Sequence, residues 1–238
     1  MIVVRSTLFF LLQSMLTVVF SFIALLTFPL PLIARYRIIT LWSRLVVRLA
    51  TSICGIRYRV IGGDNLPSSP SIVLAKHQSA WETLAFQVLL PPQVWVLKRE
   101  LLSIPFFGWG LAMTNPIAID RGSGLRALKQ MLEQGRDRLA RGFWIVMFPE
   151  GTRVAPGERG QYFVGGAWLA VQTGTPVVPI AHNAGTVWPK GAFLKRPGTI
   201  VVSIGPPMDP RGLKAEQFNR QVETWIETEV ERLGSARA

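Results

Sequence analysis

Hydrophobic positions divide the chain into a continuous apolar stretch near its start and a longer part in which short apolar runs alternate with helical patterns. There is no charged residue between Ser6 and Ala34, and the 22 residues Thr7–Phe28 would form a helix of about 33 Å. The hydrocarbon core of a bilayer is about 30 Å thick. The segment is therefore long enough to span a membrane.

Two prolines leave a second arrangement open for this stretch. Pro29 and Pro31 end the helix, because proline lacks a backbone N–H group. Polar side chains also dilute the stretch, at Gln13, Ser14, Thr17 and Ser21. A shallow hairpin resting in one leaflet is therefore as well supported as a full crossing. A cleaved signal peptide is disfavoured, because the stretch exceeds the usual apolar core of about 7–15 residues.

A basic amphipathic pattern follows the prolines. Arg37, Arg44 and Arg48 fall on one helical face. The apolar residues beside them are Ile38, Trp42, Leu45 and Leu49. This pattern predicts a helix in the membrane interface, with a surface helix packed on the domain as the alternative. Because Arg5 alone precedes the apolar stretch, the positive-inside rule places the following domain in the cytoplasm.

From residue 56 onward, runs rich in isoleucine and valine alternate with segments of helical spacing, as in α/β domains. The predicted strands are Ile56–Ile61, Ser71–Ala75, Val94–Leu97, Ile117–Asp120, Phe143–Phe148, Val177–Ala181 and Ile200–Ile204. The predicted helices are Ala80–Leu90, Leu125–Ala140, Ala167–Gln172 and Ala215–Leu233. We expect a membrane anchor and interfacial helix over residues 1–55, and an α/β domain with a mixed, mostly β sheet core flanked by helices over residues 56–238.

Composition and charge narrow the possible classes of protein. Hydrophobic residues make up 49% of the chain and charged residues 17%, which excludes a disordered chain and favours membrane contact. The net charge of +12 favours anionic partners such as phospholipid head groups or an acidic carrier. We expect no nucleic-acid binding, because the basic residues are scattered and form no recognised motif. Cys54 is the single cysteine, so neither an intrachain disulfide nor a cysteine-based metal site can form.

A histidine and a carboxylate stand where a predicted strand gives way to a helix. His77 follows the strand Ser71–Ala75, and Glu82 lies five residues later, in the first turn of a helix that Ser79 is expected to cap. Imidazole can act as a base near neutral pH, and a carboxylate near a helix N-terminus is favoured in its ionised form. The pair predicts a general base oriented by Glu82. Alternatively Glu82 completes a capping box with Ser79, and the two roles can coexist.

An abrupt turn follows the strand Phe143–Phe148, at a place where α/β folds commonly bind ligands. It has the sequence Phe148-Pro149-Glu150-Gly151-Thr152-Arg153. Arg153, and Arg121 after the strand Ile117–Asp120, could grip a phosphate through bidentate hydrogen bonds, while Glu150 could accept from a hydroxyl group. The alternative is that both arginines form ordinary surface ion pairs.

Taken together, four segments resemble, in order and spacing, the four blocks of the glycerolipid acyltransferase family. They occupy residues 71–183 and comprise the His77–Glu82 pair, Ile119-Asp120-Arg121, Phe148-Pro149-Glu150-Gly151-Thr152-Arg153 and Val177-Val178-Pro179-Ile180. The resemblance implies transfer of a fatty acyl chain from an acyl thioester, either acyl-CoA or acyl carrier protein. The implied acceptor is the sn-2 hydroxyl of 1-acyl-glycerol-3-phosphate (lysophosphatidic acid), and the product is phosphatidic acid.

The resemblance also assigns roles to single residues. It implies that His77 deprotonates the acceptor hydroxyl and that Glu82 holds the imidazole. It implies substrate binding by Arg121, Phe148, Pro149, Glu150, Gly151, Thr152 and Arg153. Lys98 matches a family lysine near the active site and could stabilise the oxyanion, with a solvated loop lysine as the alternative. This mechanism needs no metal, no cofactor and no covalent enzyme intermediate, and we expect it at the cytoplasmic side of a bacterial inner membrane.

Two departures from the family pattern and three other functions remain in view. The family usually has aspartate at the position of Glu82 and often asparagine at that of Lys76, so the extra methylene of Glu82 bears on the geometry of the pair. His182 is more readily explained as a structural residue than as a second catalytic group. The alternatives are acylation of another lysolipid, such as a lysophospholipid or lyso-ornithine lipid, a hydrolase, and a non-catalytic membrane adaptor. No Gly-x-Ser-x-Gly motif supports the hydrolase.

Overall fold

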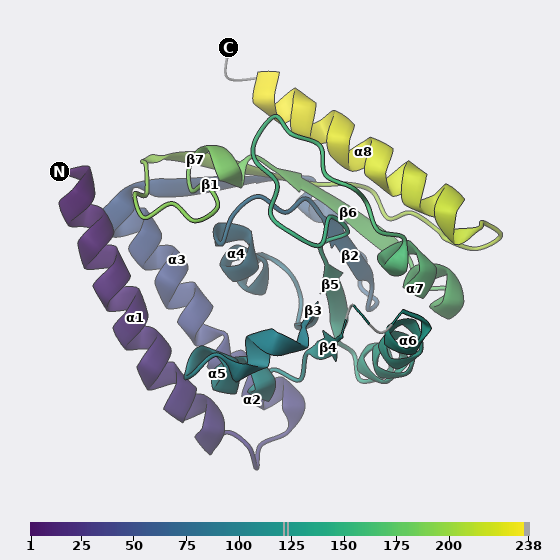
Figure 1. The fold of residues 1–238 in the computed structure, drawn as a ribbon, viewed down its shortest axis with the longest axis horizontal. Helices are drawn as coiled ribbons and strands as arrows, with labels where there is room; N and C mark the ends of the chain where they lie inside the picture. The colour runs from purple at the N-terminus through teal and green to yellow at the C-terminus, as the bar shows by residue number, and fades with distance from the viewer. Residues whose placement is uncertain (121, 123, 236–238) are drawn as a thin grey trace.

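The computed structural model describes residues 1–120, 122 and 124–235. Its centre is a seven-stranded sheet in the order β1-β7-β6-β2-β5-β3-β4, with helices on both sides (Figure 1). All neighbouring strands are parallel except β6 and β7. The strands are β1 Ile56–Ile61, β2 Ile72–Ala75, β3 Gln93–Lys98, β4 Ile117–Ile119, β5 Trp144–Met147, β6 Val177–His182 and β7 Gly198–Ile204. The prediction of a mixed α/β fold, and of all seven strands, is confirmed.

The helices include all four that were predicted for the α/β domain, with ends shifted by a few residues. The α-helices are α1 Ile2–Leu26, α2 Leu32–Ile39, α3 Leu41–Cys54, α4 Trp81–Leu89, α5 Phe107–Met113, α6 Leu125–Ala140, α7 Gly165–Thr173 and α8 Ala215–Ser235. Short 3₁₀ turns within the described residues include η1 Gly63–Asn65, η2 Arg99–Ser103 and η4 Ala184–Thr186.

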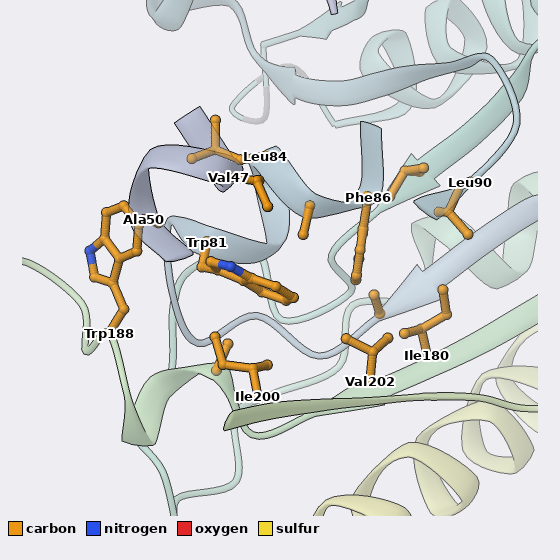
Figure 2. Packing of buried hydrophobic residues seen from close by; sticks show 14 of the residues in the cluster. Val47, Ala50, Trp81, Leu84, Phe86, Leu90, Ile180, Trp188, Ile200 and Val202 are labelled. Atoms are coloured by element: carbon orange, nitrogen blue, oxygen red, sulfur yellow. The ribbon is translucent and has the colours of Figure 1, made fainter. Parts of the chain in front are cut away.

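Two hydrophobic cores lie on opposite faces of the sheet, because successive side chains of a strand point to opposite sides. In β2, Val73 and Ala75 face α3 and α4, whereas Ile72 and Leu74 face α7 and α8. Figure 2 shows the first core, where Trp81 and Phe86 of α4 fill the space above the sheet. These side chains anchor the start of α4 against the sheet.

The N-terminal helices pack into the two cores instead of standing apart from them: α1 and α3 contribute to the first core, and α2 contributes Tyr36 to the second. Phe9 of α1 is fully buried and stacks edge-on against Trp188, with ring centroids 5.4 Å apart. Near the other end of α1, the Ser21 hydroxyl donates to the carbonyl of Phe106, at 2.7 Å. α1 therefore lies against the domain at both ends. It is also the one helix among the described residues that is long and apolar enough to cross a membrane.

The basic pattern after the prolines forms two helices, where one was predicted. Thr40 ends α2 and precedes α3, and its hydroxyl donates to the Tyr36 carbonyl at 2.9 Å. α3 buries Ser43, Val46, Val47, Ala50 and Cys54. Arg44 and Arg48 are exposed, as expected for the polar face.

The short helix α5 was not predicted. Its segment carries Pro105, Gly108 and Gly110, which favour a loop. The structure explains Gly108 by close packing, since a Cβ atom there would lie 2.3 Å from the carbonyl oxygen of Leu102. Gly110 brings α5 close to Ser21 and Ala24 of α1. Small residues therefore serve helix packing here, which local sequence does not show.

The sheet order brings the sequence blocks to one edge. β2, β5, β3 and β4 are adjacent and parallel, so their C-terminal ends meet at the same edge. His77 follows β2, the Phe148–Arg153 segment follows β5, and Lys98 ends β3. Ligands commonly bind at this edge of α/β sheets.

Candidate active site

His77 and Glu82 form a hydrogen-bonded pair at the start of α4. The Nδ1 atom of His77 lies 2.9 Å from Oε1 of Glu82. The His77 side chain is 14% exposed, whereas that of Glu82 is fully buried. A carboxylate accepts the Nδ1 hydrogen, which leaves Nε2 as the basic nitrogen of the neutral ring. The arrangement is that of an oriented general base.

The same Glu82 oxygen organises the backbone between the two residues. It accepts the N–H groups of Gln78, at 2.9 Å, and of Ser79, at 2.7 Å. Burial opposes ionisation, but the neighbouring histidines and the Ser79 N–H group outweigh it, so the pKa of Glu82 lies below its ordinary value. Glu82 is therefore an ionised carboxylate that can stabilise an imidazolium on His77.

Both sequence interpretations of Glu82 are realised together. As in a capping box, its side chain reaches back to the Ser79 N–H group while it also holds His77. The helix begins at Trp81 with Ala80 at the cap position, one residue later than expected. Ser79 still contributes, because its hydroxyl oxygen accepts the Trp81 N–H group at 3.1 Å.

The segment after β5 encloses His77 from the other side. The ring of Phe148 stacks on the imidazole, with centroids 3.9 Å apart and planes 9° from parallel. The carbonyl of His77 accepts the Val154 N–H group at 2.8 Å. Gly151 has a φ of +67°, which favours glycine over other residues at this turn. Both the ring and the backbone of His77 are thus fixed by this segment.

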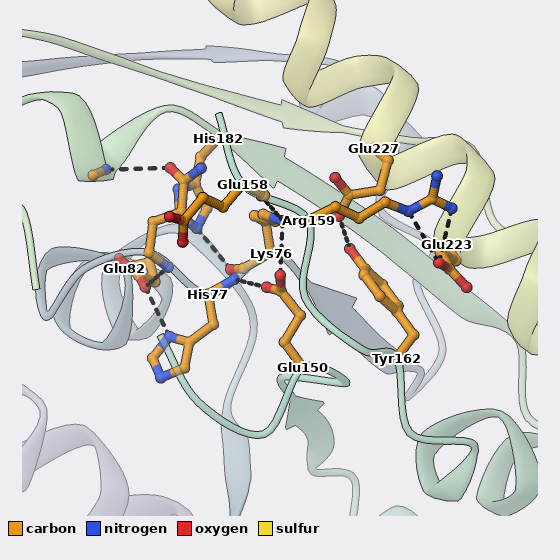
Figure 3. Close-up of polar contacts among 12 residues, drawn as sticks. Lys76, His77, Glu82, Glu150, Glu158, Arg159, Tyr162, His182, Glu223 and Glu227 are labelled. Atoms are coloured by element: carbon orange, nitrogen blue, oxygen red, sulfur yellow. Dashed lines mark hydrogen bonds and ion pairs between the residues drawn. The ribbon is translucent and has the colours of Figure 1, made fainter. Parts of the chain in front are cut away.

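Glu150 points into the protein, and it is not among the residues that line the neighbouring cavity. Its Oε1 atom lies 2.7 Å from the buried amine of Lys76, and its Oε2 atom accepts the His77 N–H group at 2.9 Å (Figure 3). Burial raises the pKa of Glu150 above its ordinary value, although Lys76 and the His77 N–H group lower it. The carboxylate is occupied by protein groups, so this geometry favours a role for Glu150 in holding His77.

A mostly apolar cavity of about 400 Å³ opens beside His77. Its walls come from α1, α4, α5 and the end of β3, together with Phe148, Gly151 and Arg153 of the segment after β5. From α1, the lining residues are Gln13, Thr17, Phe20 and Ser21. Sequence analysis missed these residues, because their pattern alone indicates contact with lipid. The cavity has the character of a site for an acyl chain.

Two predicted cationic residues line this cavity, Lys98 and Arg153. The Nε atom of Arg153 is buried and has no hydrogen-bond partner among the described residues. Thr152 is exposed, and Pro149 is buried with its carbonyl accepting the Phe163 N–H group at 2.9 Å. Arg121, the other predicted phosphate ligand, lies outside the described residues.

Lys190 is a cation near the site that sequence analysis did not identify. Its amine lies 3.2 Å from the carbonyl oxygen of Arg153 and 3.5 Å from the Thr152 hydroxyl. Lys190 precedes a glycine in an exposed loop 38 positions after Thr152. No local signal could have placed it here.

His182 is a buried structural residue, in agreement with the expectation. Its Nδ1 atom accepts the Ala184 N–H group at 3.2 Å, so Nε2 carries the hydrogen and donates it to the Lys76 carbonyl at 2.8 Å. Burial lowers the pKa of His182, and the ring is neutral. Within the described ranges, no group of three or more histidine, cysteine or acidic side chains could hold a metal ion.

Comparison with known proteins identifies the family of this chain. Residues 57–183 match the family model described as Acyltransferase. The 1-acyl-sn-glycerol-3-phosphate acyltransferase of Pseudomonas aeruginosa is 46% identical over 228 residues, covering 94% of this chain and 89% of that protein. The enzyme of that name from Cocos nucifera is 28% identical, covering 93% and 72%.

A solved structure has the same fold. The crystal structure of the 1-acyl-sn-glycerophosphate (LPA) acyltransferase from Thermotoga maritima superimposes with a TM-score of 0.82, covering 98% of this chain and 96% of that one at 24% identity. The family model covers more than half of the chain, and the Pseudomonas relative covers nearly all of it. This chain therefore belongs to the acyltransferase family.

Proposed function

We propose that this enzyme transfers a fatty acyl chain from an acyl thioester to the sn-2 hydroxyl of 1-acyl-glycerol-3-phosphate, giving phosphatidic acid, with His77 as the general base. The observation that carries the proposal is the His77–Glu82 pair at the opening of an apolar cavity. The names of the bacterial and plant relatives support the acceptor.

The reaction proceeds without a covalent enzyme intermediate. Nε2 of His77 takes the hydroxyl proton as the oxygen attacks the thioester carbonyl, and ionised Glu82 stabilises the imidazolium. The tetrahedral intermediate then breaks its C–S bond, and the imidazolium returns the proton to the leaving thiolate. Positioned general-base catalysis contributes about 10²–10⁴-fold.

Charge and shape assign the remaining roles. Lys98 stabilises the oxyanion of the tetrahedral intermediate. Arg153 binds the acceptor phosphate, together with Arg121, because a guanidinium group can make two parallel hydrogen bonds to a phosphate. The apolar cavity takes an acyl chain, whose burial there is favourable.

The enzyme works on membrane phospholipid precursors at the surface of a bilayer. α1 presents many apolar side chains to the outside, including Phe10, Phe22 and Leu26. Because its opposite side rests on the domain at both ends, α1 lies within one leaflet and does not cross the membrane. We place the enzyme at the cytoplasmic side of a bacterial inner membrane, where Arg37, Arg44 and Arg48 face anionic head groups.

The test is transfer of radiolabelled palmitate from palmitoyl-CoA, and separately from palmitoyl acyl carrier protein, to lysophosphatidic acid. Membranes carry either the wild-type protein or His77→Ala. We expect phosphatidic acid with at least one donor, and a loss of about 10²–10⁴-fold in the variant. Equal activity of the two proteins would exclude His77 as the base.

Matched lysolipids identify the acceptor. Lysophosphatidic acid, a lysophospholipid with a larger head group and lyso-ornithine lipid are compared at equal concentration. If the enzyme prefers one of the larger lysolipids, that lysolipid is its acceptor. Thioester loss without any acceptor would instead indicate a hydrolase.

A further inference from the structure

The amine of Lys76 is a buried charge that the proposed reaction does not use. Its side chain is fully buried, and the residue directly precedes His77. The amine contacts Glu150 at 2.7 Å, Glu227 at 2.8 Å and the Glu158 carbonyl at 3.4 Å. A lysine amine has three hydrogens, so these contacts account for all its donors. Such a charge is tolerated in the interior only when it is fully paired.

The first side of this network leads directly to His77. Glu150 contacts Lys76 through one oxygen and the His77 N–H group through the other. The Lys76 carbonyl belongs to the same peptide group as the His77 N–H, and it accepts a hydrogen bond from His182 at 2.8 Å. The peptide group that carries His77 is therefore held at both its N–H and its C=O. Because Glu150 is the acceptor of this N–H group, the orientation of its carboxylate sets the position of the His77 peptide group.

The other side of the network leads to the C-terminal helix. Glu227 lies on α8, 151 positions after Lys76. Its Oε1 atom also accepts the Tyr162 hydroxyl at 2.7 Å. Figure 3 shows Lys76 between Glu150 and Glu227, with Tyr162 beside them. α8 thus reaches the catalytic segment through one carboxylate that touches neither His77 nor the cavity.

We propose that Lys76 and Glu227 are positioning residues for His77, acting through Glu150. The inference rests on the proposed function, because it takes His77 as the base. Lys76 binds Oε1 of Glu150, and this contact orients Oε2 toward the His77 N–H group. Glu227 contacts the amine from the opposite side and so keeps the amine from moving toward Glu150. A small displacement of a base from its reactive geometry can cost about 10²-fold in rate.

The network makes an uncommon prediction for double substitution. Lys76→Met leaves Glu150 and Glu227 as two buried carboxyl groups without a counter-charge, so they either repel each other or share a proton, and in both cases Glu150 is drawn away from the His77 N–H group. Adding Glu227→Gln removes one of these charges. We therefore expect the double variant to recover part of the activity that Lys76→Met loses. Purely structural damage would instead accumulate with the second substitution.

The experiment measures kcat and KM for both substrates in Lys76→Met, Glu227→Gln and the double variant, with the intact protein in phospholipid vesicles. The control is Glu223→Gln, because Glu223 lies one turn away on α8 and pairs with exposed Arg159. We expect kcat to fall by about 10²-fold in Lys76→Met and about tenfold in Glu227→Gln, with KM for lysophosphatidic acid unchanged. Glu223→Gln should match the wild type.

Folding is followed separately. The protein contains two histidines, so histidine labelled with ¹⁵N in the ring gives imidazole signals from His77 and His182 alone. We expect the variants to keep dispersed signals while the His77 resonances shift. If Lys76→Met does not fold, Glu227→Gln alone decides the question.

The inference is wrong if Glu227→Gln behaves like Glu223→Gln, or if the double variant is less active than either single variant. It is equally wrong if KM for lysophosphatidic acid rises while kcat is unchanged, since Glu150 would then act on the acceptor. Failure of the proposed function has a different signature, which is wild-type acyl transfer that does not depend on His77.

Discussion

The Glu82 carboxylate concentrates its interactions on one oxygen. Oε1 contacts Nδ1 of His77 and two backbone N–H groups, whereas buried Oε2 has no hydrogen-bond partner among the described residues. This side chain reaches the imidazole ring and the start of the helix together. Glu82 therefore links local folding at α4 to the orientation of the proposed base.

The pH dependence of stability tests this link. Because the pKa of Glu82 is lowered in the fold, its carboxylate stabilises the native state above about pH 4.3, the ordinary pKa of an unfolded glutamate. This contribution is lost as the pH falls through the lower folded pKa. We expect Glu82→Gln to cost about 1–3 kcal/mol at pH 7. In thermal unfolding, the difference from wild type should narrow below about pH 4.

Exposed Glu133 supplies the control for this comparison. Glu133→Gln should have the same thermal stability as the wild type both at pH 7 and below about pH 4. A destabilisation by Glu82→Gln that is the same at pH 7 and at acid pH would show that the charge of Glu82 is not its source.

Arg153 offers a second test of a single side chain. If its guanidinium binds the acceptor phosphate, Arg153→Gln removes charge-assisted hydrogen bonds of about 1.5–3 kcal/mol. We expect KM for lysophosphatidic acid to rise roughly 10- to 100-fold, with a smaller effect on an acceptor without phosphate. Arg196→Gln changes an exposed arginine outside the cavity and should have wild-type kinetics. An equal effect on both acceptors would show that Arg153 does not bind the acceptor phosphate.

Among the secondary-structure elements, α1 has two different sides. Thr17 lines the cavity, whereas neighbouring Val18 is 38% exposed and does not line it. A helix that follows the apolar pattern of a membrane segment thus also forms part of the proposed substrate site. Because adjacent residues on a helix point about 100° apart, one substitution can change either side alone.

Substitution on these two sides should separate chain-length selection from membrane contact. We expect Thr17→Trp to fill part of the cavity and to impair transfer of long acyl chains more than short ones. Each excluded methylene costs about 0.8 kcal/mol, so excluding two lowers kcat/KM by roughly tenfold. Val18→Trp should leave the chain-length profile unchanged. Measuring kcat/KM with acyl thioesters of eight to eighteen carbons checks this, and a parallel loss at all lengths would contradict it.

For the whole molecule, the contacts at both ends of α1 decide its orientation toward the bilayer. Phe9 packs on Trp188 and Ser21 bonds to Phe106, so the domain would have to enter the membrane if α1 crossed it. Charged groups such as Arg57 and Lys190 are spread over the exposed surface of the domain, and burying them in hydrocarbon is costly. These contacts therefore support the proposal that the molecule rests on one side of the membrane.

Cysteine labelling tests this orientation, because the native Cys54 is buried and the wild type gives a low background. Val3→Cys lies near the start of α1, and Gln217→Cys lies at an exposed position of α8. We expect a membrane-impermeant maleimide to label Gln217→Cys in inverted inner-membrane vesicles and not in intact spheroplasts. Val3→Cys should show the same sidedness. Labelling of the two positions from opposite sides would show that α1 spans the bilayer.

Local patterns were sufficient to predict the seven strands, the helices α4, α6, α7 and α8, and the His77–Glu82 pair, but not the short helix α5. Alternation and helical spacing are properties of neighbouring residues, and five positions are few enough for a helix start to bring the pair together. Long-range packing alone set the direction of Glu150, the contact of Lys76 with Glu227 and the cavity wall on α1. These depend on β2 lying between β5 and β6, and on helices from both ends of the chain covering that sheet. Residues 151 positions apart meet because of that order, which no spacing along the chain reveals.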